Sequence, residues 1–260
     1  MKVGCIVDYL LKKYPLEYAS DFDSGKLGLV IGSKNIELTN VMLALDLNLD
    51  VVNDAINKGC NLIIAHHPYF FHPITKINYD SEQGQVIRKM IMNNINLYCM
   101  HTNFDVLDGG INDTLTKLLK LENVQIINGE VGKDNFLRYG NLSSPMTLDR
   151  LIDYVKECFE LTDVKYIGRL DKVIKTVGII GGGGGSERDV LAASFKCDCY
   201  ISGEFRLSSG QLAKSIGLSL IEVNHGVEKL SMYPLKEELD KEFLIDTIVT
   251  NVNTDPFNFK

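Results

Sequence analysis

The sequence predicts an α/β fold of two interlinked α/β lobes with mostly parallel sheets. Short apolar runs of strand length alternate along the chain with stretches of helical periodicity. This β-α-β-α order favours parallel strands covered by helices. In addition, 260 residues with 45% hydrophobic content are enough to bury a full core, and one compact chain of two lobes is expected.

The elements of the first half are set by periodicity and by residues that end helices. Apolar residues at helical spacing predict a first helix that stops before Pro15. Gly59 is the expected C-terminal glycine of the second helix, and Ser81 is a suitable N-cap for the third. The predicted helices are 3–13, 49–58, 81–93 and 109–119. The predicted strands are a short one at the end of 20–32, then 41–46, 62–65 and 95–100.

The second half continues the alternation after a polar crossing at 122–145. Strands are predicted at 124–127, 136–142, 164–167, 175–180, 200–201, 218–223 and 245–249. Helices are predicted at 147–159, 187–195, 207–216 and 226–243, with a kink or break at Pro234 and a tail after the last strand, at 253–260. The predicted lobes are 1–125 plus 225–260, which carries most of the metal ligands proposed below, and 126–224. A weak internal repeat, 55–68 with 192–205 and 96–103 with 219–226, favours two similar lobes.

Composition limits the class of protein. Lys+Arg of 27 against Asp+Glu of 34 gives a net charge of −7 without a basic tract, which argues against a binder of nucleic-acid phosphates unless a ring has a basic lumen. No apolar run approaches the roughly 20 residues of a membrane span, and the first residues do not resemble a signal peptide. The six cysteines form no CxxC pair, so reduced thiols and a cytoplasmic location are expected.

The histidines follow apolar runs. The run 62–65 ends at His66-His67-Pro68, where proline stops the strand, and His101 and His225 each follow a later apolar run. Sites in open α/β sheets gather at the carboxyl ends of strands, and histidine is the commonest metal ligand. We therefore expect these strand ends to converge on a metal site in the cleft between the lobes.

The candidate metal ligands are His66, His67, Asp105, His225 and Glu228. His225 and Glu228 are three apart at the start of a predicted helix, which places them on one face. Three imidazoles and two carboxylates are too many for one tetrahedral ion with an open position. They suit two ions about 3.5–4 Å apart, although one ion with an outer carboxylate is the alternative. Nitrogen and oxygen ligands fit Zn, Mn, Fe, Co or Ni.

Each feature also has a simpler interpretation. Paired histidines before a proline are usually a polar loop, Asp105 alone fits a turn or a helix cap, and the H-x-x-E pair alone is weak. Their joint occurrence at strand ends favours the metal site. The glycines at 181–185 lack the Lys-Ser/Thr of a P-loop, so close backbone packing at a strand–helix turn is favoured over phosphate binding.

At these residues the chain resembles the Nif-three-like family, described as dinuclear-metal-centre proteins and often named type-2 GTP cyclohydrolase homologues. The similar segments are SDFDSGKLGLVIG (20–32), LALDLNLDVVNDAINKGCNLIIAHHP (43–68), HTNFDVLDGGINDTL (101–115), YISGE (200–204) and NHGVE (224–228). The resemblance implies that His66, His67, Asp105, His225 and Glu228 hold two divalent metal ions per subunit, with Glu228 as the bridge. It also implies a toroidal homohexamer. The family usually spaces the last His and Glu by four residues instead of three.

The function expected from the resemblance is a metal-dependent hydrolase of the cyclohydrolase or phosphoesterase type. Water activated by the metals would attack a nucleotide-like substrate. His101 or Glu204 would be the catalytic proton shuttle or would orient a ligand. No basic cluster for a triphosphate stands out. The alternative is a non-enzymatic metal-binding scaffold or interaction ring, so the sequence leaves open whether the protein is an enzyme.

Overall fold

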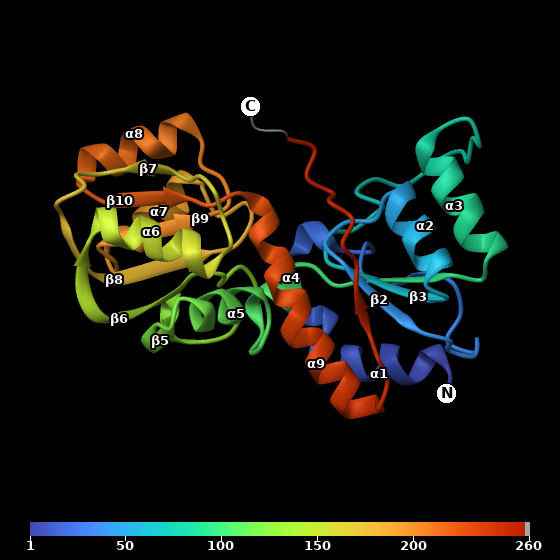
Figure 1. Ribbon diagram of the computed structural model, residues 1–260. Coiled ribbons are helices and arrows are strands. Elements are labelled where there is room, and N and C mark those ends of the chain that lie inside the picture. The colour runs from blue at the N-terminus through green and yellow to red at the C-terminus, as the bar shows by residue number, and fades with distance from the viewer. Residues whose placement is uncertain (258–260) are drawn as a thin grey trace. The chain divides into compact units, whose positions relative to one another are not determined.

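The computed structural model describes residues 1–257, so residues 258–260 of the predicted C-terminal tail lie outside the described residues. The chain forms two compact units, Met1–Phe104 with the segment from Met232 onward, and Asp105–Ser231, each with its own sheet (Figure 1). These units place 105–125 and 225–231 with the second sheet. The limits of the predicted lobes, 1–125 plus 225–260 and 126–224, stay a prediction.

The first unit contains a five-stranded sheet in the order β1-β4-β3-β2-β11. Its strands are β1 Gly28–Ile31, β2 Val41–Ala44, β3 Leu62–Ala65, β4 Asn96–Cys99 and β11 Ile248–Val249. Four of them are parallel, and β1 is antiparallel at the edge. The helices are α1 Val3–Lys13, α2 Leu49–Asn57, α3 Glu82–Met92 and α9 Met232–Phe243, with the short 3₁₀ helices η1 Leu16–Tyr18 and η2 Asp21–Asp23.

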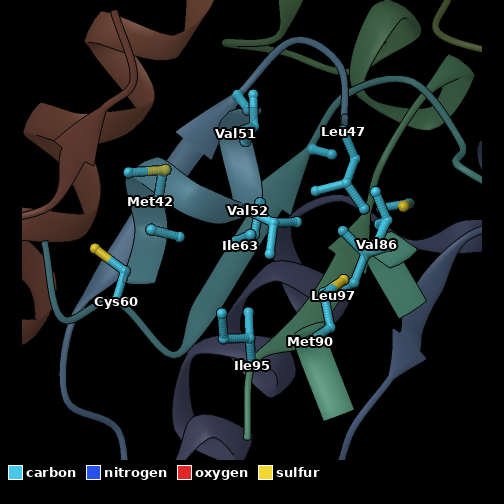
Figure 2. Packing of buried hydrophobic residues seen from close by; sticks show 14 residues of the cluster. Met42, Leu47, Val51, Val52, Cys60, Ile63, Val86, Met90, Ile95 and Leu97 are labelled. Atoms are coloured by element: carbon cyan, nitrogen blue, oxygen red, sulfur yellow. The ribbon is translucent and has the colours of Figure 1, made fainter. Parts of the chain in front are cut away.

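Helices cover both faces of this sheet, which explains why its strands are continuous apolar runs instead of alternating ones. Figure 2 shows Ile63 of β3 and Leu97 of β4 packed with Val52 of α2 and Met90 of α3, all in one buried cluster. Successive residues of a strand point to opposite faces. The alternate residues, such as the buried Leu43, therefore face the side where α1 and α9 lie in Figure 1.

The second unit contains a six-stranded mixed sheet in the order β5-β6-β8-β9-β10-β7. Its strands are β5 Glu122–Ile126, β6 Arg138–Thr147, β7 Lys165–Ile167, β8 Val173–Ile180, β9 Cys199–Ser202 and β10 Ser219–Glu222. The central β8, β9 and β10 are parallel, and the outer strands pair antiparallel. The helices are α5 Ile111–Leu118, α6 Leu148–Cys158, α7 Glu187–Ser194 and α8 Leu207–Ile216, with η3 Ile127–Gly129, η4 His225–Ser231, and α4 Thr102–Val106 at the junction of the units.

A second buried cluster holds α7 and α8 on this sheet. Val190 of α7 and Ala213 of α8 pack with Tyr200 of β9 and Leu220 of β10. The start of α7 is fixed locally, because Ser186 and Asp189 satisfy each other's backbone N–H groups in a capping box. The strands and helices thus confirm the predicted α/β class with two sheets and parallel strands at the centre of each.

The helical stretch around Pro234 is divided, as predicted for 226–243, but the division lies before the proline. The 3₁₀ helix η4 ends at Ser231 and α9 begins at Met232, so Pro234 lies in the first turn of α9. Proline is tolerated there because the first N–H groups of a helix have no partner within the helix. Among the residues that the structure describes, no helix combines the length and the apolar character needed to cross a membrane.

Asp198, which precedes β9, ties that strand to β8. Its Oδ2 accepts hydrogen bonds from the backbone N–H groups of Lys175 at 2.9 Å and Thr176 at 3.0 Å, and from the Thr176 hydroxyl at 3.1 Å. Burial acts to raise the pKa of Asp198, but these hydrogen bonds outweigh it and the pKa is lowered. The carboxylate form is therefore the one that stabilises the fold.

Asp198→Ala is expected to lower the free energy of unfolding at pH 7 by about 2 kcal/mol, because hydrogen bonds to a charged group are lost. A lowered folded-state pKa means that this stability is fully present above the unfolded value and is lost as the pH falls through the folded value. Urea denaturation of both proteins at pH 7 and pH 3 should show the difference shrinking at the lower pH. A difference that is constant with pH would contradict a charged Asp198.

Candidate metal centre

Three imidazoles gather at the carboxyl ends of neighbouring strands in the first unit. β3 and β4 are parallel, with Ala65 opposite Cys99, so the residues that follow them emerge at the same edge of the sheet. His66, His67 and His101 each offer a ring nitrogen within 4.8 Å of the others. His66 is 1% exposed, so the group lies partly inside the unit.

The Nδ1 atom of each imidazole faces an acceptor. His66 Nδ1 lies 3.0 Å from the Met100 carbonyl oxygen, His67 Nδ1 lies 2.6 Å from Asp46 Oδ1, and His101 Nδ1 lies 2.9 Å from Asp23 Oδ2. A carbonyl or a carboxylate can only accept, so Nδ1 of each ring carries a proton, and Nε2 is the nitrogen left to bind a metal. Metal-binding histidines are oriented in this way by their outer partners.

The two carboxylates behind the imidazoles stay charged. Burial acts to raise the pKa of Asp46, but the hydrogen bond and charge of His67, and the hydrogen bond of Thr254, outweigh it and the pKa is lowered. The pKa of Asp23 is lowered too, because His101 and Thr102 outweigh its burial. Charged acceptors keep the Nδ1–H tautomer of both rings.

The C-terminal segment reaches this group, although the sequence predicts only a tail there. Thr254 donates its hydroxyl to Asp46 Oδ2 at 2.6 Å, on the carboxylate that holds His67. Thr250, four residues earlier, donates its hydroxyl to Asp54 Oδ2 at 2.7 Å. Val252 packs against the core cluster between them, so this segment is anchored to the first unit.

The second unit holds the remaining predicted ligands. His225 and Glu228 lie on η4, a 3₁₀ helix, where residues three apart lie directly above one another. His225 Nε2 is accordingly 3.2 Å from Glu228 Oε2. The spacing of three in this sequence, where the family usually has four, is thus matched by the tighter helix.

Two buried carboxylates approach each other beside His225. Asp105 is 9% exposed and Glu228 is 3% exposed, and each offers an oxygen within 4.8 Å of the other. Like charges at this distance in a buried place repel, and a cation is the usual compensation. Glu204, which follows β9, accepts from His225 Nδ1 at 2.8 Å. His225 therefore turns Nδ1 to an acceptor, as the other three imidazoles do.

The glycine run packs closely against these side chains. Gly182 has φ +61°, and a Cβ on it would lie 2.3 Å from Glu228 Oε1 and 2.8 Å from His225 Nε2. A Cβ on Gly185 would lie 1.9 Å from the Glu204 carbonyl oxygen. Close backbone packing at 181–185, the interpretation favoured from the sequence, agrees with these approaches.

Two buried polar side chains hold the backbone around Asp105. Asn112 donates to the Asp105 carbonyl oxygen at 3.0 Å and accepts from Gly181 N–H at 2.8 Å. Arg138, 1% exposed, donates to the Val106 carbonyl oxygen at 2.6 Å and to Asp113 Oδ1 at 2.8 Å. The carboxylate of Asp105 therefore sits on a backbone that is fixed from both sides.

An α/β chain with groups of imidazoles and carboxylates of this kind defines a candidate metal-binding protein. The family model of Duf34/NIF3 (NGG1p interacting factor 3) matches residues 1–256, and the chain belongs to this family. This confirms the resemblance seen in the sequence.

Known proteins are similar to the chain over its whole length. A Clostridium acetobutylicum protein named "GTP cyclohydrolase 1 type 2 homolog" is 34% identical over 271 residues, covering 100% of this chain and 99% of the relative. The crystal structure of a Staphylococcus aureus hypothetical protein has a TM-score of 0.92 at 30% identity, covering 100% of this chain and 99% of that one. A Bacillus cereus protein related to NIF3, with a TM-score of 0.89 at 23% identity and the same coverage, shows the fold alone.

The predicted site residues thus fall into two groups, each within one unit. His101, expected as a proton shuttle, lies with His66 and His67. Glu204 accepts a hydrogen bond from His225. Sequence reasoning missed the partners that orient the ligands: Asp23, Asp46, Asn112 and Thr254. Asp46 could have been found, since it ends the apolar run 41–45 as the histidines end theirs.

Proposed function

We propose that the protein binds two divalent metal ions per subunit through His66, His67, Asp105, His225 and Glu228 and acts as a metal-dependent hydrolase. The observation that carries the proposal is the shared orientation of the imidazoles. His66, His67, His101 and His225 all turn Nδ1 to a carbonyl or carboxylate acceptor. Four histidines held in the Nδ1–H tautomer are unusual for a structural role and are typical of metal ligands.

The donors fit the proposed ions. They are imidazole nitrogens and carboxylate oxygens without a thiolate, a set that suits Zn, Mn, Fe, Co or Ni. Bound ions would act as Lewis acids and would lower the pKa of water. Glu228, which lies beside both Asp105 and His225, is the carboxylate best placed to serve as the bridge that the family resemblance implies.

Glu204 and His101 would handle protons and orientation. Glu204 accepts from His225 Nδ1, and its side chain is 64% exposed. It can therefore exchange a proton with solvent while it holds the ring of His225. The Asp23 carboxylate is fully buried and holds His101, so His101 is the more rigid of the two.

A nucleotide-like substrate, a homohexamer and a cytoplasmic location complete the proposal. The name of the Clostridium acetobutylicum relative refers to GTP cyclohydrolase, and the resemblance to the Nif-three-like family implies the ring. The alternative, a non-enzymatic metal-binding scaffold or interaction ring, uses the same ligands. The hydrolase and the scaffold hypotheses predict the same metal content, but only the hydrolase would turn over a substrate.

Elemental analysis of the purified protein, with subunit stoichiometry by light scattering, tests the metal and the ring. We expect two ions per chain and six chains per particle. Turnover of GTP, other nucleotides and phosphodiesters is then measured during metal titration, with His67→Ala as the variant that loses metal. Full metal occupancy without turnover of any substrate would favour the scaffold, and a wild-type protein that binds no divalent ion would overturn the proposal.

Asp46→Asn is expected to lower the affinity for zinc by about 10–100-fold, the usual cost of losing an outer partner of a metal ligand. Thr254→Val should cause a smaller loss in the same direction, because it removes the hydroxyl that holds Asp46. Titration against a chromophoric chelator measures both. Thr250→Val is the matched control, since its hydroxyl binds Asp54 and not Asp46. Equal losses for Thr250→Val and Thr254→Val would contradict a specific role for Thr254.

A further inference from the structure

The loop that begins with the paired histidines exposes apolar side chains. It runs over residues 66–81, between β3 and α3, and contains no helix or strand. Loops of this length without secondary structure are usually either functional or disordered. Phe71 on this loop is 48% exposed, and Phe22 on η2 is 57% exposed. Exposed phenylalanines near a candidate site are a feature of ligand binding.

A lysine ammonium lies close to both phenylalanine rings. Lys26 Nζ lies 5.9 Å from the centroid of the Phe22 ring and 5.3 Å from the centroid of the Phe71 ring. We call Phe22, Lys26 and Phe71 the aromatic cradle. Two ring faces with one positive charge are complementary to a molecule that has a planar ring and, apart from it, a negatively charged group.

The aromatic cradle borders the imidazole group of the same unit. The Phe22 ring packs edge-on against His101, with centroids 6.2 Å apart and an interplanar angle of 73°. Phe22 is followed directly by Asp23, which holds His101. Phe71 lies on the loop that starts at His66. A molecule held by the aromatic cradle would therefore lie next to His101, which is grouped with the proposed metal ligands His66 and His67.

We propose that the aromatic cradle binds the base of a nucleotide-like substrate, with Phe22 and Phe71 stacking on the base and Lys26 pairing with a phosphate. This inference rests on the proposed function and names the residues that would select its substrate. A cation over an exposed ring is a weak contact, and stacking of a base on an aromatic ring is the stronger one. The base can thus replace the ammonium over the ring faces and free it for the phosphate.

The charge in the aromatic cradle favours this ligand over a purely apolar occupant. A lipid chain or an apolar face of another protein would have to cover the Lys26 ammonium or displace it without giving it a partner, which costs free energy. A nucleotide supplies both a planar ring and an anion.

Isothermal titration of the full-length protein with GTP, guanosine and inorganic tripolyphosphate tests the inference. Phe22→Ala and Phe71→Ala should weaken GTP and guanosine by about tenfold or more while leaving tripolyphosphate unchanged. Lys26→Met should weaken GTP and tripolyphosphate and leave guanosine unchanged. Phe22→Trp should keep GTP binding, because tryptophan also stacks on bases.

Tyr79→Ala is the matched control. Tyr79 is 55% exposed and has the Arg88 guanidinium carbon 5.0 Å from its ring centroid, so it resembles the aromatic cradle without belonging to it. The inference is overturned if Phe22→Ala and Phe71→Ala bind GTP as Tyr79→Ala does, or if wild type binds none of the three probes. It is also overturned if these variants change only the size of the particle in light scattering.

Elemental analysis of the same samples separates this inference from the proposed function. Wild-type protein with two ions per chain, and variants whose GTP binding is unchanged, would reject the aromatic cradle and keep the metal centre. Protein without metal whose GTP binding depends on Phe22 and Phe71 would reject the metal centre and keep the aromatic cradle.

Discussion

Glu228→Gln is expected to reduce metal affinity by more than the roughly 10–100-fold that the loss of an outer partner costs. The change keeps the size of the side chain and removes its charge. Glu228 is buried, lies beside Asp105 and is 3.2 Å from His225 Nε2. A neutral amide cannot bridge two cations, so both ions should be affected. Elemental analysis and chelator titration measure the loss.

Glu187→Gln is the matched control for this substitution. Glu187 is an exposed carboxylate in the same unit, in the first turn of α7, and its replacement should leave metal content unchanged. Circular dichroism should show that Glu228→Gln is folded. If folded Glu228→Gln kept two ions with wild-type affinity, Glu228 could not be the bridge. Loss of one ion alone would indicate that Glu228 binds a single cation.

Arg138→Ala is expected to lower the free energy of unfolding by about 3 kcal/mol, the lower end of the usual cost of breaking a buried ion pair from one side, because the side chain of Asp113 is 19% exposed. Arg138 is 1% exposed and donates to Asp113 Oδ1, to the Val106 carbonyl oxygen and to the Asn135 carbonyl oxygen. Alanine would leave a carboxylate and two carbonyl groups without these donors. Chemical denaturation followed by circular dichroism measures the change.

The effect of Arg138→Ala should extend to the candidate metal centre. Val106 follows Asp105 directly, so loosening its carbonyl should also loosen the backbone that presents the Asp105 carboxylate. Metal affinity should therefore fall together with stability. Arg150→Ala, at an exposed position of α6, is the control and should change stability by no more than about 0.5 kcal/mol. A similar small effect for Arg138→Ala would show that its ion pair does not stabilise the unit.

The residue types of the candidate site could be predicted because they follow a local pattern. An apolar run marks a strand, and His66 and His67 come directly after it. The spacing of His225 and Glu228 could likewise be read as one helix face, although the structure has the tighter 3₁₀ form. The helical stretch over 226–243 is divided as predicted, but sequence alone did not show that the division lies between Ser231 and Met232 and not at Pro234.

The sequence by itself determined the α/β class, the strand ends and the histidines, aspartate and glutamates that stand at them, because periodicity and turn residues act between near neighbours. Only the tertiary structure decided which carboxylate orients which ring. Asp23 reaches His101 across 78 positions, and Thr254 reaches Asp46 across 208. Such pairs depend on the order of the strands and the path of the chain after the last one, and neither leaves a repeating pattern in the residues themselves.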